Sequence, residues 1–111
     1  MANAFKNKGL AGIGTSFTTA YTCPSSTTST IIGMTVANIS SSSNITVGVR
    51  VYDNSAGAYY TIVNYASIPI GGSLVVVGGD QKIVLEASDT IQVYSSSSGN
   101  ADAFLSILEQ T

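Results

Sequence analysis

Residues 71–98 contain three short apolar runs separated by residues that favour turns, and this spacing constrains the fold more than any other feature of the sequence. The first run, residues 74–77, stops at a Gly-Gly-Asp turn, and residues 83–85 follow it. Ile91 and Val93 then alternate with polar residues until a run of serines ends the pattern. A glycine pair can adopt the positive φ of a tight reversal, and short alternating runs are typical of β-strands. The segment predicts three consecutive strands of a small β-sandwich.

The same period of two recurs in the rest of the chain. The clearest apolar face consists of Ile45, Val47, Val49 and Val51. Because side chains alternate between the two faces of a strand, this pattern indicates a strand with one buried face. A second face of this kind is expected at Ile32, Met34 and Val36. The strands expected outside residues 71–98 are residues 16–22, 27–39, 45–52, 59–65 and 103–109.

The last of these strands differs from the others because both of its faces are largely apolar. In residues 103–109, Leu105 and Ile107 alternate with Phe104, Ser106 and Leu108. Strands of this composition are typically covered on both sides. In a thin sandwich, we expect the second cover to be another subunit. Apolar residues do not recur at helical spacing over a dozen positions, so the sequence predicts an all-β fold.

The chain has 111 residues, which is enough for one domain with a substantial core. Residues 1–14 contain several glycines and lack the alternation of a strand, so they predict a flexible N-terminal arm. Residues 15–111 are expected to form one antiparallel β-sandwich of about eight short strands. The glycines of the arm do not predict a phosphate-binding loop, because such a loop lies between a buried strand and a helix.

Charge and cysteine content exclude several classes of protein. The net charge is −2, and only Lys6 and Lys8 lie together among the basic residues, so no basic patch for nucleic acid is expected. Cys23 is the single cysteine, which excludes an intrachain disulfide and fits folding in a reducing cytoplasm. The N-terminus is a poor signal peptide, and no run approaches the length of a membrane span. Charged residues make up 9% of the chain against about 25% in an ordinary domain, so we expect partners, including other copies of the chain, to cover part of the surface.

The residues that usually carry catalysis are scarce. The chain has no histidine, which removes the common general base and the nucleophile pairs that depend on it. The carboxylates stand mainly in turns, where they cap the backbone. Residues 53–55 and the pair Asp80 and Gln81 offer oxygen ligands without a recognisable calcium spacing. We therefore predict no catalytic residue, no metal site and no cofactor, and we expect Cys23 to be a small buried apolar residue.

Six tyrosines and no tryptophan give the sequence its one suggestive excess. Tyrosine packs at sheet edges, is enriched in protein interfaces and, beside Asn or Asp, can stack on sugars. Packing explains most of these residues best, a protein interface comes second and a sugar site third. The candidate interface residues are Lys6, Lys8, Tyr59, Tyr60, Phe104 and Leu108.

Three segments carry a resemblance to a known group of proteins. YTCPSSTTSTIIGMTVANIS, IPIGGSLVVVGGDQKIVLEASDTIQVYSSSS and ADAFLSILE resemble small virion proteins of tailed bacteriophages, including marine and cyanobacterial phages. Within them, KIVLEASDTIQV is similar to the strand-turn-strand of jelly-roll proteins, in which a Leu-x-x-Gly-Asp-x-Ile pattern is frequent. Ser88 stands where that pattern has glycine, so the turn need not be identical. The metal-binding cupins share the pattern, but their histidines are missing here.

This resemblance implies a jelly-roll-like sandwich that acts as a non-enzymatic structural component of a virion. The expected role is a capsid decoration or cement protein, often a trimer, that stabilises contacts between copies of the major capsid protein. A neck, tail or fibre-associated protein is the alternative, and a small carbohydrate-binding adhesin domain is a weaker one. In each virion case, the protein would be made in the host cytoplasm and located in the virion.

Overall fold

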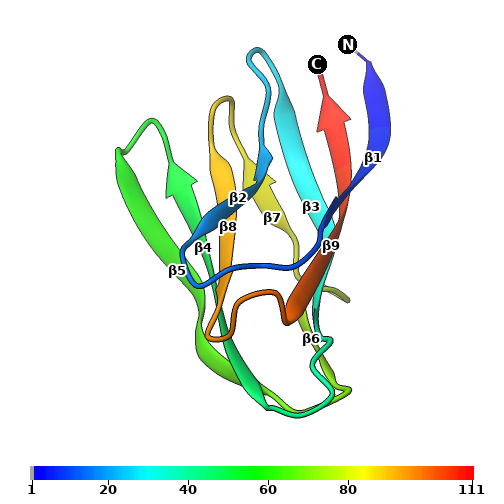
Figure 1. Ribbon diagram of the computed structural model, residues 1–111. Coiled ribbons are helices and arrows are strands. Elements are labelled where there is room, and N and C mark those ends of the chain that lie inside the picture. The colour runs from blue at the N-terminus through cyan, green and yellow to red at the C-terminus, as the bar shows by residue number, and fades with distance from the viewer. Residues whose placement is uncertain (1) are drawn as a thin grey trace.

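The computed structural model describes residues 2–111, which form two antiparallel sheets that face each other (Figure 1). We call them the β9 sheet and the β4 sheet after a central strand of each. The β9 sheet consists, in spatial order, of β1 (Asn3–Leu10), β9 (Ala101–Gln110), β3 (Thr28–Asn38) and, side by side along the far edge of β3, β6 (Ser73–Val77) and β7 (Ile83–Leu85). The β4 sheet consists, in spatial order, of β2 (Thr18–Thr22), β8 (Thr90–Ser95), β4 (Ile45–Asp53) and β5 (Ala58–Ile68).

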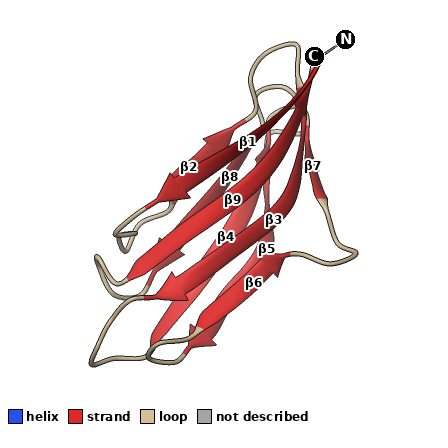
Figure 2. Ribbon diagram, turned by 90° about the vertical axis from the view of Figure 1, so that its right-hand side faces the viewer, coloured by secondary structure: helices blue, strands red, loops and turns tan. Residues whose placement is uncertain are grey.

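The strands pair from the two ends of the chain toward its middle. The first strand, β1, pairs with the last, β9; β2 pairs with β8; β3 pairs with β6 and β7; and β4 pairs with β5. This order describes one long hairpin rolled into two sheets, which is the jelly roll. It confirms the predicted antiparallel, jelly-roll-like sandwich, and both ends of the described chain lie at the same end of the molecule (Figure 2). The described residues contain no helix, and therefore none long and apolar enough to cross a membrane.

The core lies between the two sheets and follows the predicted alternation. Ile45, Val47 and Val49 of β4 are at most 1% exposed, as are Leu105 and Ile107 of the facing sheet. Because one residue in two points inward on each strand, these side chains pack into a single layer between the sheets. The apolar alternation of β4 and β9 thus specified both the strands and their buried faces.

The alternation expected in β3 is wrong at one position. Met34 and Val36 are buried, but Ile32 is half-buried and does not share their inner face. The register between β3 and β9 shifts between Ile31 and Gly33. A bulge of this kind adds one residue to a strand and changes which face the following residues occupy. Ile31, which is fully buried, takes the inward place that Ile32 was expected to hold.

The flexible N-terminal arm is also wrong for most of its length. Residues Asn3–Leu10 form β1 and pair with β9 from Asn3↔Gln110 to Leu10↔Ala103. Seven of the eight residues of β1 are exposed, so the strand exists by backbone pairing and buries almost no side chain. A strand of this kind leaves no apolar alternation in the sequence, which is why the pattern did not predict it. Ile13, further along, is 2% exposed and belongs to the core.

Candidate interaction surfaces

The outer face of the β9 sheet carries large apolar side chains among small polar ones. Residues directly opposite each other in antiparallel strands place their side chains on the same face. The register pairs Phe5 with Leu108 and places Phe104, like Val75, opposite Thr35, so all of these side chains point away from the core. The set that we call the apolar face is Phe5, Ile32, Val75, Val84, Phe104 and Leu108.

These side chains are exposed to an unusual degree. Phe5 is 78% exposed, Val75 65%, Val84 60% and Phe104 54%. Phe104 stands between two shallow hollows: one of about 400 Å³ bordered by Gly9, Thr35 and Ala37, and one of about 340 Å³ bordered by Phe5 and Ile32. Among the described strand residues that point outward on this sheet, Asp102 alone is charged. The apolar face therefore presents exposed apolar side chains beside two shallow hollows, with little charge.

The outer face of the β4 sheet carries a different group, which we call the aromatic cluster: Phe17, Arg50, Tyr52, Tyr59, Tyr65 and Tyr94. The guanidinium of Arg50 lies between two rings, 3.9 Å from the ring centre of Phe17 and 3.8 Å from that of Tyr59. Its Nε also donates to the side-chain oxygen of Gln92 at 2.7 Å. These contacts fix Arg50 against the sheet and use both faces of its guanidinium.

Tyr94 occupies the centre of this cluster. Its ring packs against Phe17 and Tyr65, with ring centres 4.8 Å and 5.5 Å away. The hydroxyl is buried and makes no hydrogen bond to the described residues. Burial raises the pKa of Tyr94 to about 12, and the neighbouring Tyr65 phenol adds to the rise. Tyr94 is therefore a neutral packing residue, whereas Tyr59 and Tyr65 are more than half exposed.

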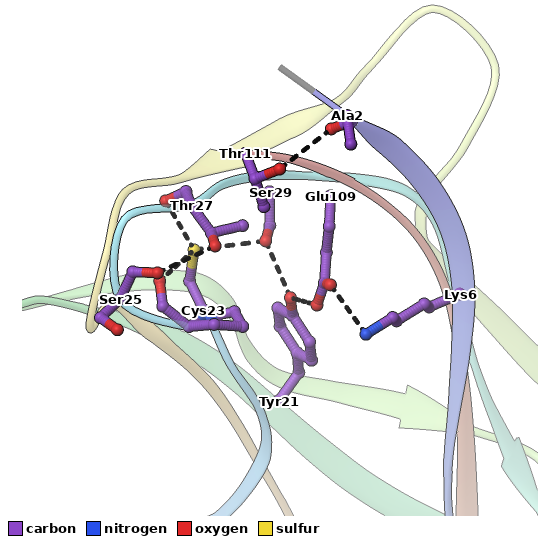
Figure 3. Close-up of polar contacts among 10 residues, drawn as sticks. Ala2, Lys6, Tyr21, Cys23, Ser25, Thr27, Ser29, Glu109 and Thr111 are labelled. Carbon is purple, nitrogen blue, oxygen red and sulfur yellow. Dashed lines mark hydrogen bonds and ion pairs between the residues drawn. The ribbon is translucent and has the colours of Figure 1, made fainter.

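A polar network joins four strands at the end of the sandwich where the termini lie (Figure 3). The Tyr21 hydroxyl donates to Glu109 and accepts a hydrogen bond from the Ser29 hydroxyl at 2.8 Å. The Nζ of Lys6 lies 3.0 Å from the other carboxylate oxygen of Glu109. The Cys23 thiol is buried, lies 3.2 Å from the Ser29 hydroxyl and donates to the backbone carbonyl of Thr27 at 3.3 Å. The network connects β1, β2, β3 and β9.

The network stabilises the ionised form of Glu109. Hydrogen bonding from Tyr21, followed by that from Lys6, holds the pKa of Glu109 below its usual range, although burial alone would raise it. Burial and the Glu109 carboxylate together raise the pKa of Tyr21, so that phenol stays neutral. The Glu109 carboxylate is therefore ionised, and each of its oxygens has a partner on another strand. Its role is to hold these strands together.

Three carboxylates gather where the β4–β5 and β7–β8 connections meet. Asp53, Glu86 and Asp89 place carboxylate oxygens within 4.8 Å of one another. Asp89 is buried, and its two oxygens accept the backbone N–H groups of Asn54 and Glu86, each at 2.9 Å. Asp53 accepts the hydroxyl of Ser55 at 2.9 Å. Asp89 thus joins two loops, as expected for an aspartate in a turn.

The structure separates the predicted interface residues into three groups. Phe104 and Leu108 lie on the apolar face. Lys6 and Lys8 project from the opposite side of β1, since they pair with the inward-facing positions Ile107 and Leu105. On β5, Tyr59 joins the aromatic cluster, and Tyr60 is 54% exposed at the edge of the β4 sheet.

Sequence reasoning missed Phe5, Val75 and Val84 as members of the apolar face. Phe5 lies in the segment predicted as an arm, and Val75 and Val84 lie in short apolar runs. Only the register with β9 and β3 places all three on the same face as Phe104 and Leu108. It also missed Glu109 and Tyr21, whose partners lie far along the chain. A signal for Glu109 was present: a carboxylate at an inward position of the last strand requires a partner.

Comparison with known proteins supports the fold. Neither a protein-family model nor a curated protein matches the sequence. Among solved structures, the capsid of Helicobacter pylori bacteriophage KHP30 matches 98% of this chain and 87% of its own chain, with TM-score 0.58 and 10% identity. Bacillus endospore appendages, described as disulfide-linked pili, match 98% of this chain and 88% of theirs, with TM-score 0.57 and 10% identity. The Drosophila NLP core, described in terms of pentamer formation and histone binding, matches 99% and 98%, with TM-score 0.52 and 10% identity.

These three structures share the sandwich with this chain at an identity that shows the fold alone. Their descriptions name pili, a phage capsid and pentamer formation. Fold does not specify function, so the role of this chain has to be argued from its own surfaces.

Proposed function

We propose that this protein is a non-enzymatic structural component of a tailed-phage virion, and specifically a capsid decoration or cement protein. It would stabilise the head by lying over junctions between copies of the major capsid protein. In this proposal the protein acts as a homo-oligomer, with a trimer favoured, and resides in the virion. A neck, tail or fibre-associated position is the alternative within the same class.

The apolar face is the observation that carries the proposal. Contiguous exposed apolar area on a small protein marks an interaction surface, because leaving it in water is unfavourable. Here exposed or half-buried apolar side chains come from all the strands of one sheet, Phe5 and Phe104 among them, with small polar residues such as Thr30 and Thr35 between them. The two-sided apolar composition of β9 predicted such a second cover. A rigid sandwich that buries one broad face against a larger surface suits a decoration protein.

The polar clusters support a structural role as well. The Glu109 carboxylate is engaged by Lys6 and Tyr21, and Asp89 by two backbone N–H groups. A general acid or base needs a free proton-accepting position near a substrate site. The oxygens of these two buried carboxylates already have partners that hold the fold together.

Quantitative mass spectrometry of purified virions tests the proposal. We expect the chain in the particle in hundreds of copies, in a fixed ratio to the major capsid protein. A copy number near that of a ring or of a fibre set would place the protein in the neck or tail. Virions that lack the chain would overturn both virion roles.

The aromatic cluster favours a second candidate, a carbohydrate-binding adhesin domain. Tyr59 and Tyr65 are 52% and 66% exposed beside Arg50, and exposed aromatic rings can stack on sugars. A glycan array with the purified protein tests this candidate. Saturable binding that is lost in Tyr59→Ala and kept in Tyr60→Ala would support it, since Tyr60 makes no ring contact within the cluster.

A further inference from the structure

Strand β1 is held on the sandwich by one neighbour. Its eight residues pair with β9, while both of its faces are exposed over residues 3–9 and its outer edge has no strand beside it in the described chain. Lys6 and Lys8, on the side toward the β4 sheet, are exposed, and strand β2 of that sheet spans five residues only. Strands with few buried contacts open at low free energy. β1 is therefore the strand that can leave the sandwich with the least loss of core packing.

The edge of β9 that receives β1 is a built site. Glu109 is 7% exposed, and Tyr21 supplies one of its hydrogen bonds from within the sandwich. The other oxygen receives Lys6, whose own side chain is 56% exposed, at 3.0 Å. A nearly buried carboxylate without its cation is costly. The site is incomplete without a β1 strand, yet nothing in its geometry requires that strand to come from the same chain.

The connection after β1 is a short hinge. Ile13 is fixed in the core, and its N–H donates to the carbonyl of Ala101 at 2.8 Å. Only Ala11 and Gly12 separate it from the end of β1, and Gly12 has a φ of 62°. A short hinge that bends through a positive φ favours exchange of the attached element, because a straightened hinge relieves the bend.

We propose that β1 is exchanged between copies of this chain, so that β1 of one copy lies on β9 of another and its Lys6 pairs with the partner's Glu109. Exchange keeps all eight register pairs and the ion pair, and only residues 11–12 change conformation. Exchange of an identical element is a low-cost route to an oligomer. The inference rests on the homo-oligomeric part of the proposed function, and it names the segment that links the subunits.

A mixture of two variants, each with one added cysteine, tests the exchange. Asn7 of β1 lies opposite Ser106 of β9, within the distance range of a disulfide. One chain carries Asn7→Cys and the other Ser106→Cys; the two are mixed, incubated at high concentration, oxidised and separated on a non-reducing gel. We expect a disulfide-linked heterodimer, identified by mass spectrometry as the 7–106 crosslink. The native Cys23 is 1% exposed and is common to all variants.

The matched control uses the same acceptor and a strand that cannot leave. Gly33 of the central strand β3 also lies opposite Ser106, and a Cβ at position 33 would be 4.0 Å from the Ser106 Cβ. Chains with Gly33→Cys and Ser106→Cys should crosslink when both changes are in one chain and should not crosslink between chains. A second exchange pair, Asn3→Cys with Gln110→Cys, repeats the test if the first pair perturbs folding.

The hinge supplies an independent readout. In the chain that carries both Asn7→Cys and Ser106→Cys, Gly12→Ala penalises the closed turn and should raise the ratio of interchain to intrachain disulfide about fivefold. Gly14→Ala, at a glycine without positive φ and with open space around it, should leave the ratio unchanged. Intrachain disulfides alone, at every concentration and in Gly12→Ala, would overturn the exchange. That result would not bear on the proposed function, because mass spectrometry of virions tests the presence of the chain independently of how its copies are linked.

Discussion

The Tyr94 ring lies over the backbone of Gly48, in the space that a side chain at position 48 would occupy. A Cβ on Gly48 would be 2.1 Å from Cε1 of Tyr94. The ring cannot move aside freely, because Phe17 and Tyr65 flank it. The glycine therefore permits the aromatic cluster to lie flat on the β4 sheet.

This contact predicts that Gly48→Ala destabilises the protein. Overpacking of this kind typically costs about 1–3 kcal/mol, because the ring and its neighbours must shift. Denaturant unfolding of the wild type and the variant measures the loss. In a Tyr94→Ala background the same substitution should cost much less, since the space is then empty. Equal costs in both backgrounds would contradict the assigned contact.

A second prediction concerns Ser88, which has a φ of 72° in the turn between β7 and β8. A residue with a Cβ is strained there by about 1–2 kcal/mol, and glycine is not, although glycine also loses more entropy on folding. Ser88→Gly should therefore stabilise the protein by about 0.5–1 kcal/mol in thermal or denaturant unfolding. Ser88→Ala, which keeps the Cβ, should give no such gain, and a loss of stability in Ser88→Gly would refute the strain.

The same turn shows what the sequence could reveal. The Leu-x-x-Gly-Asp-x-Ile pattern, with Ser88 in place of glycine, indicated a jelly-roll turn, and Ser88 adopts the backbone conformation that favours glycine. The alternation of β4 predicted its buried face correctly. Local pattern succeeded in β4 and β9 because burial of one face imposes the period of two.

Local pattern failed where a partner strand determines the outcome. The bulge beside Ile32 depends on the register with β9, and β1 depends on backbone pairing that leaves no trace in side-chain polarity. The residues of the apolar face also fall into those that local pattern predicted and those that only strand register reveals. Phe104 and Leu108 were predicted because β9 is apolar on both faces, whereas Val75 and Val84 required the register of three strands.

The Glu109 network predicts a pH dependence of stability. The pKa of Glu109 is lowered in the folded protein from its ordinary value of 4.5, so the folded state binds this proton less readily than the unfolded state. The resulting stabilisation is complete above pH 4.5 and is lost as the pH falls through the folded pKa. Free energies of unfolding measured from pH 7 to pH 3 should decline at the acid end.

Glu109→Gln tests the origin of that decline. The variant should lose about 1–3 kcal/mol at neutral pH, because Lys6 and Tyr21 lose a charged acceptor, and its stability should depend less on acid pH. Asp80→Asn, at an exposed carboxylate outside both acidic clusters, is the control and should keep the wild-type profile. An unchanged acid slope in Glu109→Gln would assign the pH dependence to other groups.

The apolar face predicts a loss of assembly without a loss of folding. Val75 and Val84 are 65% and 60% exposed and lie away from β1, so Val75→Lys with Val84→Lys should change the free energy of unfolding by less than about 1 kcal/mol. Charges buried in an interface without partners are costly, and binding to phage capsids that lack the protein should weaken roughly tenfold or more. Co-sedimentation with such capsids measures the binding.

A matched double variant on the other sheet separates this surface from a general effect of added charge. Tyr60→Lys with Ile62→Lys introduces the same two charges at exposed positions of β5, 54% and 39% exposed. It should co-sediment with the capsids as the wild type does. If the β5 variant loses binding and the Val75/Val84 variant keeps it, the contact lies on the β4 sheet. Loss in both variants would mean that net charge governs attachment, because the two changes share nothing else.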